Sequence, residues 1–341
     1  MRPKQLSEFL SKAIPARLPI LITGAPGIGK SDIVAQAAIE AEADLILSHP
    51  AVEDPTDGKG LPWMLNGEAT FMPFGNARKA QKAEKLTVWM LEDLGQATPA
   101  VQASYMQLLL ARELNGRRIP DCVTFVAATN RRTDRAGVQG ILEPVKSRFA
   151  SIVQLDPHLD DWCNWAIASG FIPANLIAFL RFKPDLLSAF VASADLTNTP
   201  SPRTWSNLAR LEALQLPSEV EQVAFAGAVG EGAAVEYLAF RRMAALLPSA
   251  DAILLDPHRG MIPKALDALY AITVALASKA NEQTFPILLI YAERLYAAQH
   301  GEFAALLARD SLRRCPKIEQ TAAFARYACG PIGQLVSGGV E

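Results

Sequence analysis

The amino-acid sequence predicts an α/β fold: a parallel five-stranded sheet with helices on both faces and two β-hairpin inserts, followed by an α-helical lid and a helical C-terminal region. Continuous apolar runs alternate with helical patterns up to residue 155. Two Asn-Gly pairs each separate short strand-like runs within that part. From Asp156 onward the strand patterns stop, and prolines punctuate helical patterns instead.

Five short apolar runs are expected to form the parallel sheet. A helical pattern from residue 30 to about residue 43 connects the first run to the second. Runs that are apolar throughout are typical of strands whose two faces are buried by crossover helices. The expected strands are residues 18–23, 44–48, 86–91, 123–129 and 151–155.

Two β-hairpins are expected as inserts in this α/β core. Asn66-Gly67 separates residues 61–65 from 68–72, and Asn115-Gly116 separates residues 112–114 from 117–119. Asn-Gly is a strong hairpin signal because both central residues of a type I′ turn need positive φ. The alternative for each segment is a plain surface loop.

The chain divides into three predicted parts. An α/β domain covers residues 1–156, the α-helical lid covers residues 157–216, and a helical C-terminal extension covers residues 217–341. The first boundary is placed at Pro157, where strand patterns end, and a softer one at Leu216-Pro217.

Composition excludes several classes of protein. Half of the 341 residues are apolar, which argues against disorder. Lys and Arg number 33 against 35 Asp and Glu, so the chain is not a general polycationic nucleic-acid coat. Apolar runs fall short of the roughly 20 residues that span a bilayer, and no signal peptide is evident. The four cysteines lie far apart, as expected for free thiols in the cytoplasm.

The first candidate site is a glycine-rich loop between the first strand and the helix that follows it. Such a loop wraps closely around phosphates, and its N–H groups and the helix N-terminus attract the anion. Lys30 would neutralise the β- and γ-phosphates and Ser31 would ligate Mg²⁺. The alternative is a glycine-rich turn without a ligand. The GxxxxGK[ST] motif comprises Gly24, Ala25, Pro26, Gly27, Ile28, Gly29, Lys30 and Ser31, and we add Asp32 to the nucleotide-binding set.

Two carboxylates follow the apolar run that ends at residue 91. Glu92 and Asp93 stand where a metal-binding acid and a water-activating acid belong, so Ser31 and Glu92 are the expected metal ligands. The usual order is Asp then Glu. The inverted order changes both side-chain lengths by one methylene, and positioning on this scale sets rates. Hydrolysis is still expected, and a weakened ATPase is the alternative. For the pair itself, the alternative is a solvated acidic loop.

Three further residues are candidates for hydrolysis. Asn130 ends the fourth strand, where a polar side chain can orient the attacking water or merely cap a turn. Arg148, in Ser147-Arg148-Phe149, could point at a neighbour's γ-phosphate or form an ordinary surface salt bridge. Residues 200–205 are typical of a helix start with proline in the first turn, so Arg203 is expected in the first turn of a lid helix, facing bound nucleotide.

In order and spacing, these residues resemble the AAA+ ATPases and, within them, the MoxR-like (dynein-related) group. The resemblance extends over residues 18–211. It includes Asp54-Pro55-Thr56-Asp57-Gly58-Lys59-Gly60-Leu61-Pro62, which is similar to the group's Asp-Pro-x-Asp-x-x-Gly-x-Pro stretch. The inverted Glu92-Asp93 pair is a departure, and no aromatic–apolar–Gly threading loop is evident.

The resemblance implies roles for residues and partners. Asn130 would be sensor 1, Arg148 an arginine finger acting in trans, and Arg203 sensor 2. The two hairpins would be inserts that face the central pore of a ring. Members of the group use ATP and Mg²⁺, are typically hexamers and often work with a partner that carries a von Willebrand factor type A domain. The expected function is therefore a ring-forming ATPase that remodels a protein partner, as MoxR-like chaperones do.

Two other functions remain open on the sequence. A nucleic-acid machine would use Arg117-Arg118 and the cluster Arg78, Lys79, Lys82 and Lys85 as its basic face, although solvated lysines on a helix are the commoner explanation. A nucleotide-gated scaffold with weak hydrolysis would account for the Glu92-Asp93 order.

Overall fold

The structure is a computed structural model that describes residues 1–114, 117–134, 137–191 and 196–337. The chain forms two compact units. The first contains residues 1–158 with residues 190 and 191, and the second contains residues 159–189 and those from 196 onward. Each unit has its own hydrophobic cores, and each is described by itself below.

The first unit is built on a five-stranded, all-parallel sheet, which confirms the predicted fold class. Its strand order is β2-β5-β8-β1-β9. This order places β1 between β8 and β9, so the loop after β1 and the end of β8 share one edge of the sheet. The strands are β1 (Ile20–Thr23), β2 (Asp44–Ser48), β5 (Thr87–Leu91), β8 (Val123–Thr129) and β9 (Ser151–Gln154).

Burial of the strands follows their position in the sheet. Every residue of the central strands β5 and β8 is buried, as their apolar runs predict. β2 is an edge strand, and Leu45 and Leu47 are each 40% exposed, so the expectation that residues 44–48 are buried on both faces is wrong. An apolar run indicates that a segment forms a strand, but it does not indicate where that strand lies in the sheet. The position depends on the strand order, which is set by other segments of the chain.

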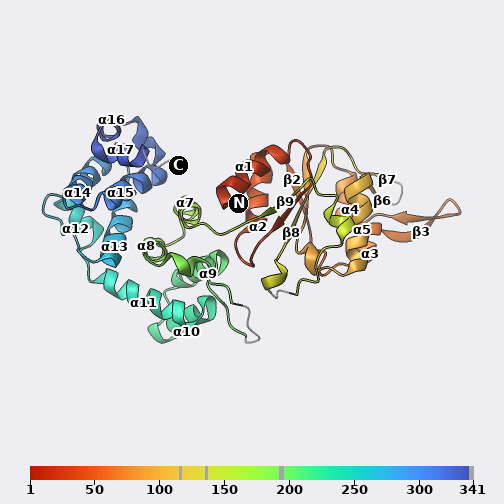
Figure 1. Cartoon of the computed structure of the whole chain (residues 1–341), viewed down its shortest axis with the longest axis horizontal. Helices are drawn as coiled ribbons and strands as arrows, with labels where there is room; N and C mark the ends of the chain where they lie inside the picture. Colours follow the sequence, from red (N-terminus) through yellow and green to blue (C-terminus); the bar gives the residue numbers. More distant parts are fainter. Residues whose placement is uncertain (115–116, 135–136, 192–195, 338–341) are drawn as a thin grey trace. The chain divides into compact units, whose positions relative to one another are not determined.

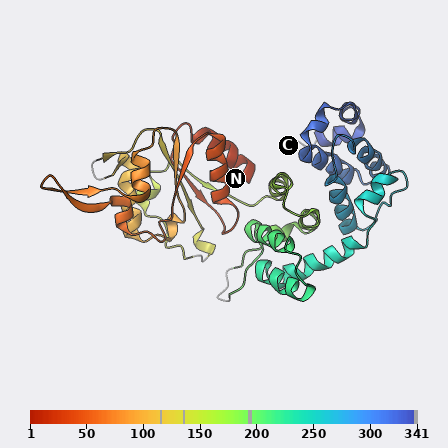
Figure 2. The same cartoon turned by 180° about the vertical axis from the view of Figure 1, so that it is seen from behind.

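Helices cover both faces of the sheet (Figures 1 and 2). On one face α1 (Pro3–Ala13) and α2 (Lys30–Glu40) bury Leu10 and Val34 against alternate strand residues. On the other face α4 (Gly75–Gln81) and α5 (Pro99–Ala111) pack on the remaining strand residues. Complete burial of a Leu or Val side chain contributes about 1.5–3 kcal/mol, so the two faces together hold the sheet rigid under the site. The second helix ends at Glu40, three residues before the predicted end.

Both predicted hairpins are present. β3 (Leu61–Leu65) and β4 (Glu68–Met72) pair antiparallel after the short helix α3 (Pro55–Lys59). Asn66 has φ 52° and Gly67 has φ 85°, the positive values that the turn requires. Figure 1 shows this hairpin extending away from the sheet.

The second hairpin is shorter than the first. β6 (Glu113–Leu114) pairs antiparallel with β7 (Arg117–Arg118), and Arg117 Nη2 lies 3.8 Å from Met72 Sδ of the first hairpin. The predicted Asn115-Gly116 turn lies outside the described residues.

The secondary-structure elements of the second unit, within its described residues, are all helices joined by loops. One core joins α7 (Leu159–Ser169), α8 (Ala174–Phe182), α9 (Pro202–Glu212), α10 (Ser218–Val229), α11 (Glu231–Ala245) and α13 (Leu266–Ala277). Phe179, Trp205 and Tyr237 form an aromatic cluster in it, with ring centroids 5.3–6.3 Å apart. This core includes side chains from both sides of residue 216, and the boundary proposed there stays a prediction.

A second core of this unit lies in the C-terminal helices. It is formed by α12 (Ala250–Leu255), α13, α14 (Phe285–Ala297), α15 (Gly301–Arg314), α16 (Ala322–Ala328) and α17 (Pro331–Ser337). A buried ion pair between Arg181 of α8 and Asp310 of α15 crosses the unit, with Nη2 3.0 Å from Oδ1. Across the described ranges of both units, none of the helices has the length and apolar character needed to cross a bilayer.

Candidate functional site

The glycine-rich loop lies between β1 and α2, where the sequence places it. Gly24 N–H donates to the carbonyl of Thr129 at 3.3 Å, which fastens the start of the loop to β8. A Cβ on Gly24 would lie 2.7 Å from the carbonyl oxygen of Leu155, so only glycine fits there without displacing β9. Gly29 has φ 92° and serves as the N-cap of α2, which directs the free N–H groups of that helix toward the loop.

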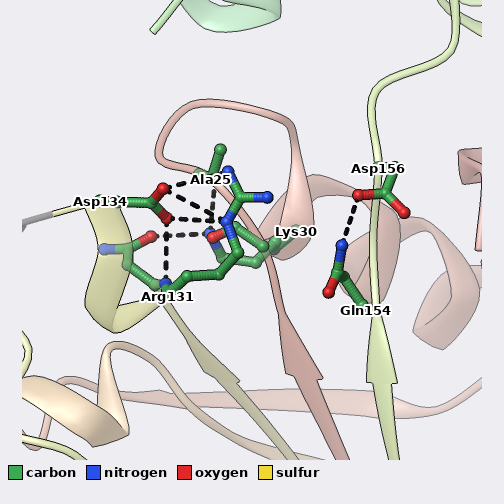
Figure 3. Close-up of polar contacts among 8 residues, drawn as sticks. Ala25, Lys30, Arg131, Asp134, Gln154 and Asp156 are labelled. Atoms are coloured by element: carbon green, nitrogen blue, oxygen red, sulfur yellow. Dashed lines mark hydrogen bonds and ion pairs between the residues drawn. The ribbon is translucent and has the colours of Figure 1, made fainter. Parts of the chain in front are cut away.

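Lys30 turns its ammonium group back over this loop. Its Nζ donates to the carbonyls of Gly24 and Ala25, both at 2.9 Å, and to Oδ1 of Asn130 at 2.8 Å. Figure 3 shows the Lys30 side chain beside Ala25. Lys30 is only 8% exposed, and a buried ammonium needs such acceptors or an anion to offset its lost hydration. Phosphate oxygens can replace these carbonyls as its partners.

Ser31 and Glu92 meet as the sequence predicts for metal ligands. The Ser31 hydroxyl donates to Oε1 of Glu92, and hydroxyl and carboxylate oxygens are the hard donors that Mg²⁺ prefers. Within the described ranges, no group of three or more His, Cys, Asp or Glu side chains could hold a metal ion by itself. The Ser31 hydroxyl and the Glu92 carboxylate fit Mg²⁺ brought in with a nucleotide, whose phosphate oxygens and water would complete the coordination.

Asn130 connects Lys30 of the glycine-rich loop to Asp93, the second acid. Its Oδ1 accepts from Lys30, and its Nδ2 donates to Oδ1 of Asp93 at 3.3 Å. Asp93 has φ 54°, a left-handed conformation that is uncommon outside glycine, at the turn just after β5. The carboxyl ends of β5 and β8 thus hold Asp93 and Asn130 together beside the loop, where an attacking water would have to be oriented.

The turn that follows Asn130 is held by an ion pair that the sequence analysis did not single out. Arg131 Nη2 lies 3.0 Å from Oδ1 of Asp134, and Asp134 also accepts from the Arg131 backbone N–H at 3.1 Å. Figure 3 shows this pair, and a separate contact from Gln154 to Asp156 at the end of β9. Asp134 is 5% exposed, so the pair fixes the backbone next to Asn130.

Three other predicted site residues take no part in the contacts described above. Asp32 is exposed in the first turn of α2. Arg148 Nη1 lies 2.9 Å from Ser147 Oγ. Arg203 is exposed on the first turn of α9, in the second unit, after a Ser201 cap that confirms the predicted helix start.

His49 is a neighbour of the acidic pair that the sequence analysis missed. Its Nδ1 lies 3.1 Å from Oε2 of Glu92. The signal was available, because His49 directly follows the predicted strand 44–48 and therefore stands at the same edge of the parallel sheet as Glu92. A single histidine after a strand is too common to have been chosen without the strand order.

Comparisons with known proteins give only distant likenesses. No protein-family model matches the chain, and no curated protein matches it. The RuvB Holliday junction branch migration motor of Thermotoga maritima is 15% identical, with a TM-score of 0.41 over 86% of this chain and 87% of that one. NtrX from Brucella abortus is 16% identical, with a TM-score of 0.40 over 89% of this chain and 67% of that one. At these values the likenesses carry no argument about family or function, and the fold assignment rests on the sheet and the loop.

Proposed function

We propose that this chain is an ATPase of the AAA+ type that binds and hydrolyses ATP with Mg²⁺. The observation that carries the proposal is the convergence of Lys30, Ser31, Glu92, Asp93 and Asn130 at one edge of the sheet. A glycine-rich turn that binds no ligand does not require an ammonium, a hydroxyl and two carboxylates beside it.

Each of these residues has a defined task in hydrolysis. The loop N–H groups and Lys30 bind the phosphates, and Ser31 and Glu92 provide oxygen donors for the metal. Bound Mg²⁺ supplies neutralisation of the charge that develops on the phosphates. Asp93 accepts a proton from the attacking water, and Asn130 orients that water with its Nδ2 group.

Nucleotide binding and turnover test this proposal directly. Fluorescent ATP analogue binding is measured with Mg²⁺ and in EDTA, and phosphate release is measured in parallel. The expected result is tight binding that requires Lys30 and release that requires Mg²⁺. A folded sample that binds no nucleotide would overturn the proposal.

The finer proposal is a ring in which neighbouring copies complete one another's sites. Arg148 is a suitable finger because it stands just before β9, and its Nη1 contacts the hydroxyl of the neighbouring Ser147. Arg203, exposed at the start of α9, is the proposed sensor 2. Mass measurement with and without nucleotide checks the ring, proposed as a hexamer, and a strict monomer under both conditions contradicts it.

A protein partner is the proposed target of the ring, in the manner of MoxR-like chaperones with a von Willebrand factor type A partner. The support is the first hairpin, where Trp63, Met64 and Phe71 are 65%, 64% and 42% exposed. Exposed apolar side chains of this size mark interaction sites for proteins. Co-purification of the chain with a von Willebrand factor type A protein, lost on replacement of Trp63 and Met64 by Ser, tests this.

A slow, nucleotide-gated scaffold is a second candidate, and the Glu92-Asp93 order favours it. Asp93 reaches one methylene less far toward the water than Glu would, and small displacements of a catalytic group lower rates strongly. Exchange of the pair to Asp-Glu should then raise turnover at least tenfold. An unchanged rate would remove this candidate and leave the ordinary ATPase.

A further inference from the structure

Glu92 has a second partner besides Ser31. Nδ1 of His49 lies 3.1 Å from Oε2 of Glu92, a distance at which an N–H group donates to a carboxylate. The backbone N–H of Glu92 donates to the carbonyl of Ser48 at 2.9 Å. The end of β2 therefore holds Glu92 at both its backbone and its carboxylate.

His49 is itself held from the core of the unit. Its backbone N–H donates to Oε1 of Glu53 at 3.2 Å, and Oε2 of Glu53 accepts from the hydroxyl of Tyr105. Tyr105 is 1% exposed on α5 and packs edge-on against Trp89 of β5, with ring centroids 6.2 Å apart. A line of contacts thus runs from the buried face of the sheet through Glu53 and His49 to Glu92.

The backbone before His49 is fixed as well. Ser48 is 2% exposed, and its hydroxyl accepts from Trp89 Nε1 and from Asn76 Nδ2, both at 3.0 Å. Asn76 Nδ2 also donates to the carbonyl of Leu47 at 2.6 Å. Because these contacts come from β5 and α4, the position of His49 is set by the packed core and not by its own exposed side chain.

We propose that His49, Glu53 and Tyr105 are positioning residues that hold the Glu92 carboxylate in place for Mg²⁺. The inference rests on the proposed function, in which Glu92 and Ser31 are the metal ligands. Glutamate has one more rotatable bond than the aspartate usual at this place, so its carboxylate loses more freedom on binding a metal. A partner on Oε2 removes that freedom beforehand and leaves Oε1 directed at Ser31.

Magnesium titration of nucleotide binding measures this role. Partners of a ligating carboxylate typically contribute about 10–100-fold in metal affinity. In His49→Ala the Mg²⁺ concentration that half-saturates binding of a fluorescent ATP analogue should rise at least about tenfold. Affinity for the analogue in EDTA should stay that of the native chain, because Lys30 and the loop are untouched.

Conservative variants separate positioning from general damage. His49→Asn keeps an N–H donor near the position of Nδ1 and should restore a nearly native Mg²⁺ requirement. Tyr105→Phe keeps the ring in the core and removes only the hydroxyl held by Glu53, so it should shift the requirement in the same direction as His49→Ala. Tyr291→Phe, which removes a hydroxyl bonded to Met261 in the second unit, and His258→Ala, at an exposed histidine, are the matched controls.

Each outcome separates this inference from the proposed function. An unchanged Mg²⁺ requirement in His49→Ala and Tyr105→Phe, with native binding intact, overturns the positioning role alone. Equal weakening of binding in EDTA overturns it too, because the change would then not concern the metal. Absence of Mg²⁺-dependent nucleotide binding in the native chain overturns the proposed function first.

Discussion

The ammonium nitrogen of Lys30 lies 2.8 Å from Oδ1 of Asn130, although 100 residues separate the two in the sequence. They meet because β1, which leads into the phosphate loop, is paired directly with β8, which ends at Asn130. The same amide donates to Asp93 through Nδ2. The Asn130 side chain thus contacts both Lys30, the proposed phosphate-binding residue, and Asp93, the proposed base.

Removal of the Lys30 ammonium should abolish nucleotide binding. We expect Lys30→Ala to lose at least about a hundredfold in affinity, because charge-assisted bonds to phosphate contribute roughly 1.5–3 kcal/mol each. Isothermal titration with ATP and Mg²⁺ measures the loss. Lys79→Ala, at an exposed position on α4, is the control and should bind as the native chain does. Native affinity in Lys30→Ala would refute the site.

Arg148→Ala should leave nucleotide binding largely intact and remove hydrolysis by a factor on the order of 10³–10⁵, the usual contribution of an arginine finger. The arginine is proposed to act across a subunit interface. Arg148→Ala and Lys30→Ala chains should each be inactive alone. A mixture of the two should release some phosphate, because some interfaces then pair an intact loop with an intact arginine. Retained hydrolysis by Arg148→Ala alone would rule out this assignment.

Gly24→Ala should damage the loop without a change of charge. The added Cβ would lie 2.7 Å from the Leu155 carbonyl oxygen and 2.6 Å from Ile28 Cδ1, so β9 or the loop must shift. Crowding of this kind typically costs about 1–3 kcal/mol, and we expect lower thermal stability and weaker ATP binding together. Gly232→Ala is the matched control: it lies in α11 with open space around the added Cβ, and it should stabilise by roughly 0.5–1 kcal/mol. Equal thermal-unfolding midpoints for Gly24→Ala and Gly232→Ala would contradict the close approach of the Leu155 carbonyl to Gly24.

The buried Arg181–Asp310 pair should be needed for stability of the second unit. Asp310→Ala leaves Arg181 charged and buried without its carboxylate, which typically costs about 3–5 kcal/mol. Calorimetry of the full chain should show a lower midpoint temperature for the thermal unfolding of this unit. The double variant Arg181→Met with Asp310→Leu should recover most of the loss, because no buried charge is left unpaired. Asp251→Ala, which breaks an exposed pair with Lys279, should cost less than about 1 kcal/mol.

Cys163 should be unreactive in the folded chain. Burial raises the pKa of its thiol to about 12, although the nearby Arg181 opposes the shift. At pH 8 a thiol reagent should modify the exposed Cys329 and leave Cys163 untouched until denaturant is added. Since the folded pKa lies above the unfolded value, Cys163 has no effect on stability at neutral pH and lowers it as the pH rises from about 9 toward 12. Rapid labelling of Cys163 under native conditions, read by mass spectrometry, would contradict its burial.

Local chemistry explains what could be predicted. The strand 123–129 and the helix start at Lys30 have the predicted bounds, because apolar β-branched runs and a glycine-rich turn are local signals. The first hairpin could be predicted from Asn66-Gly67, because the positive φ values of its turn depend on these two residues alone. The glycine-rich loop and the Glu92-Asp93 pair were singled out for the same reason, since their motif and spacing are contained in short segments.

The contacts between segments could not be predicted in the same way. His49, Glu53 and Tyr105 come from the end of β2, the loop after it and α5, and no local pattern shows that they meet. β2 lies at an edge of the sheet because it pairs with β5 alone, which depends on the strand order of the whole sheet. By itself the sequence determined the chemical groups of the site and the elements that carry them. Only the tertiary structure decided which of those groups touch, because strand order and core packing bring together residues that lie far apart along the chain.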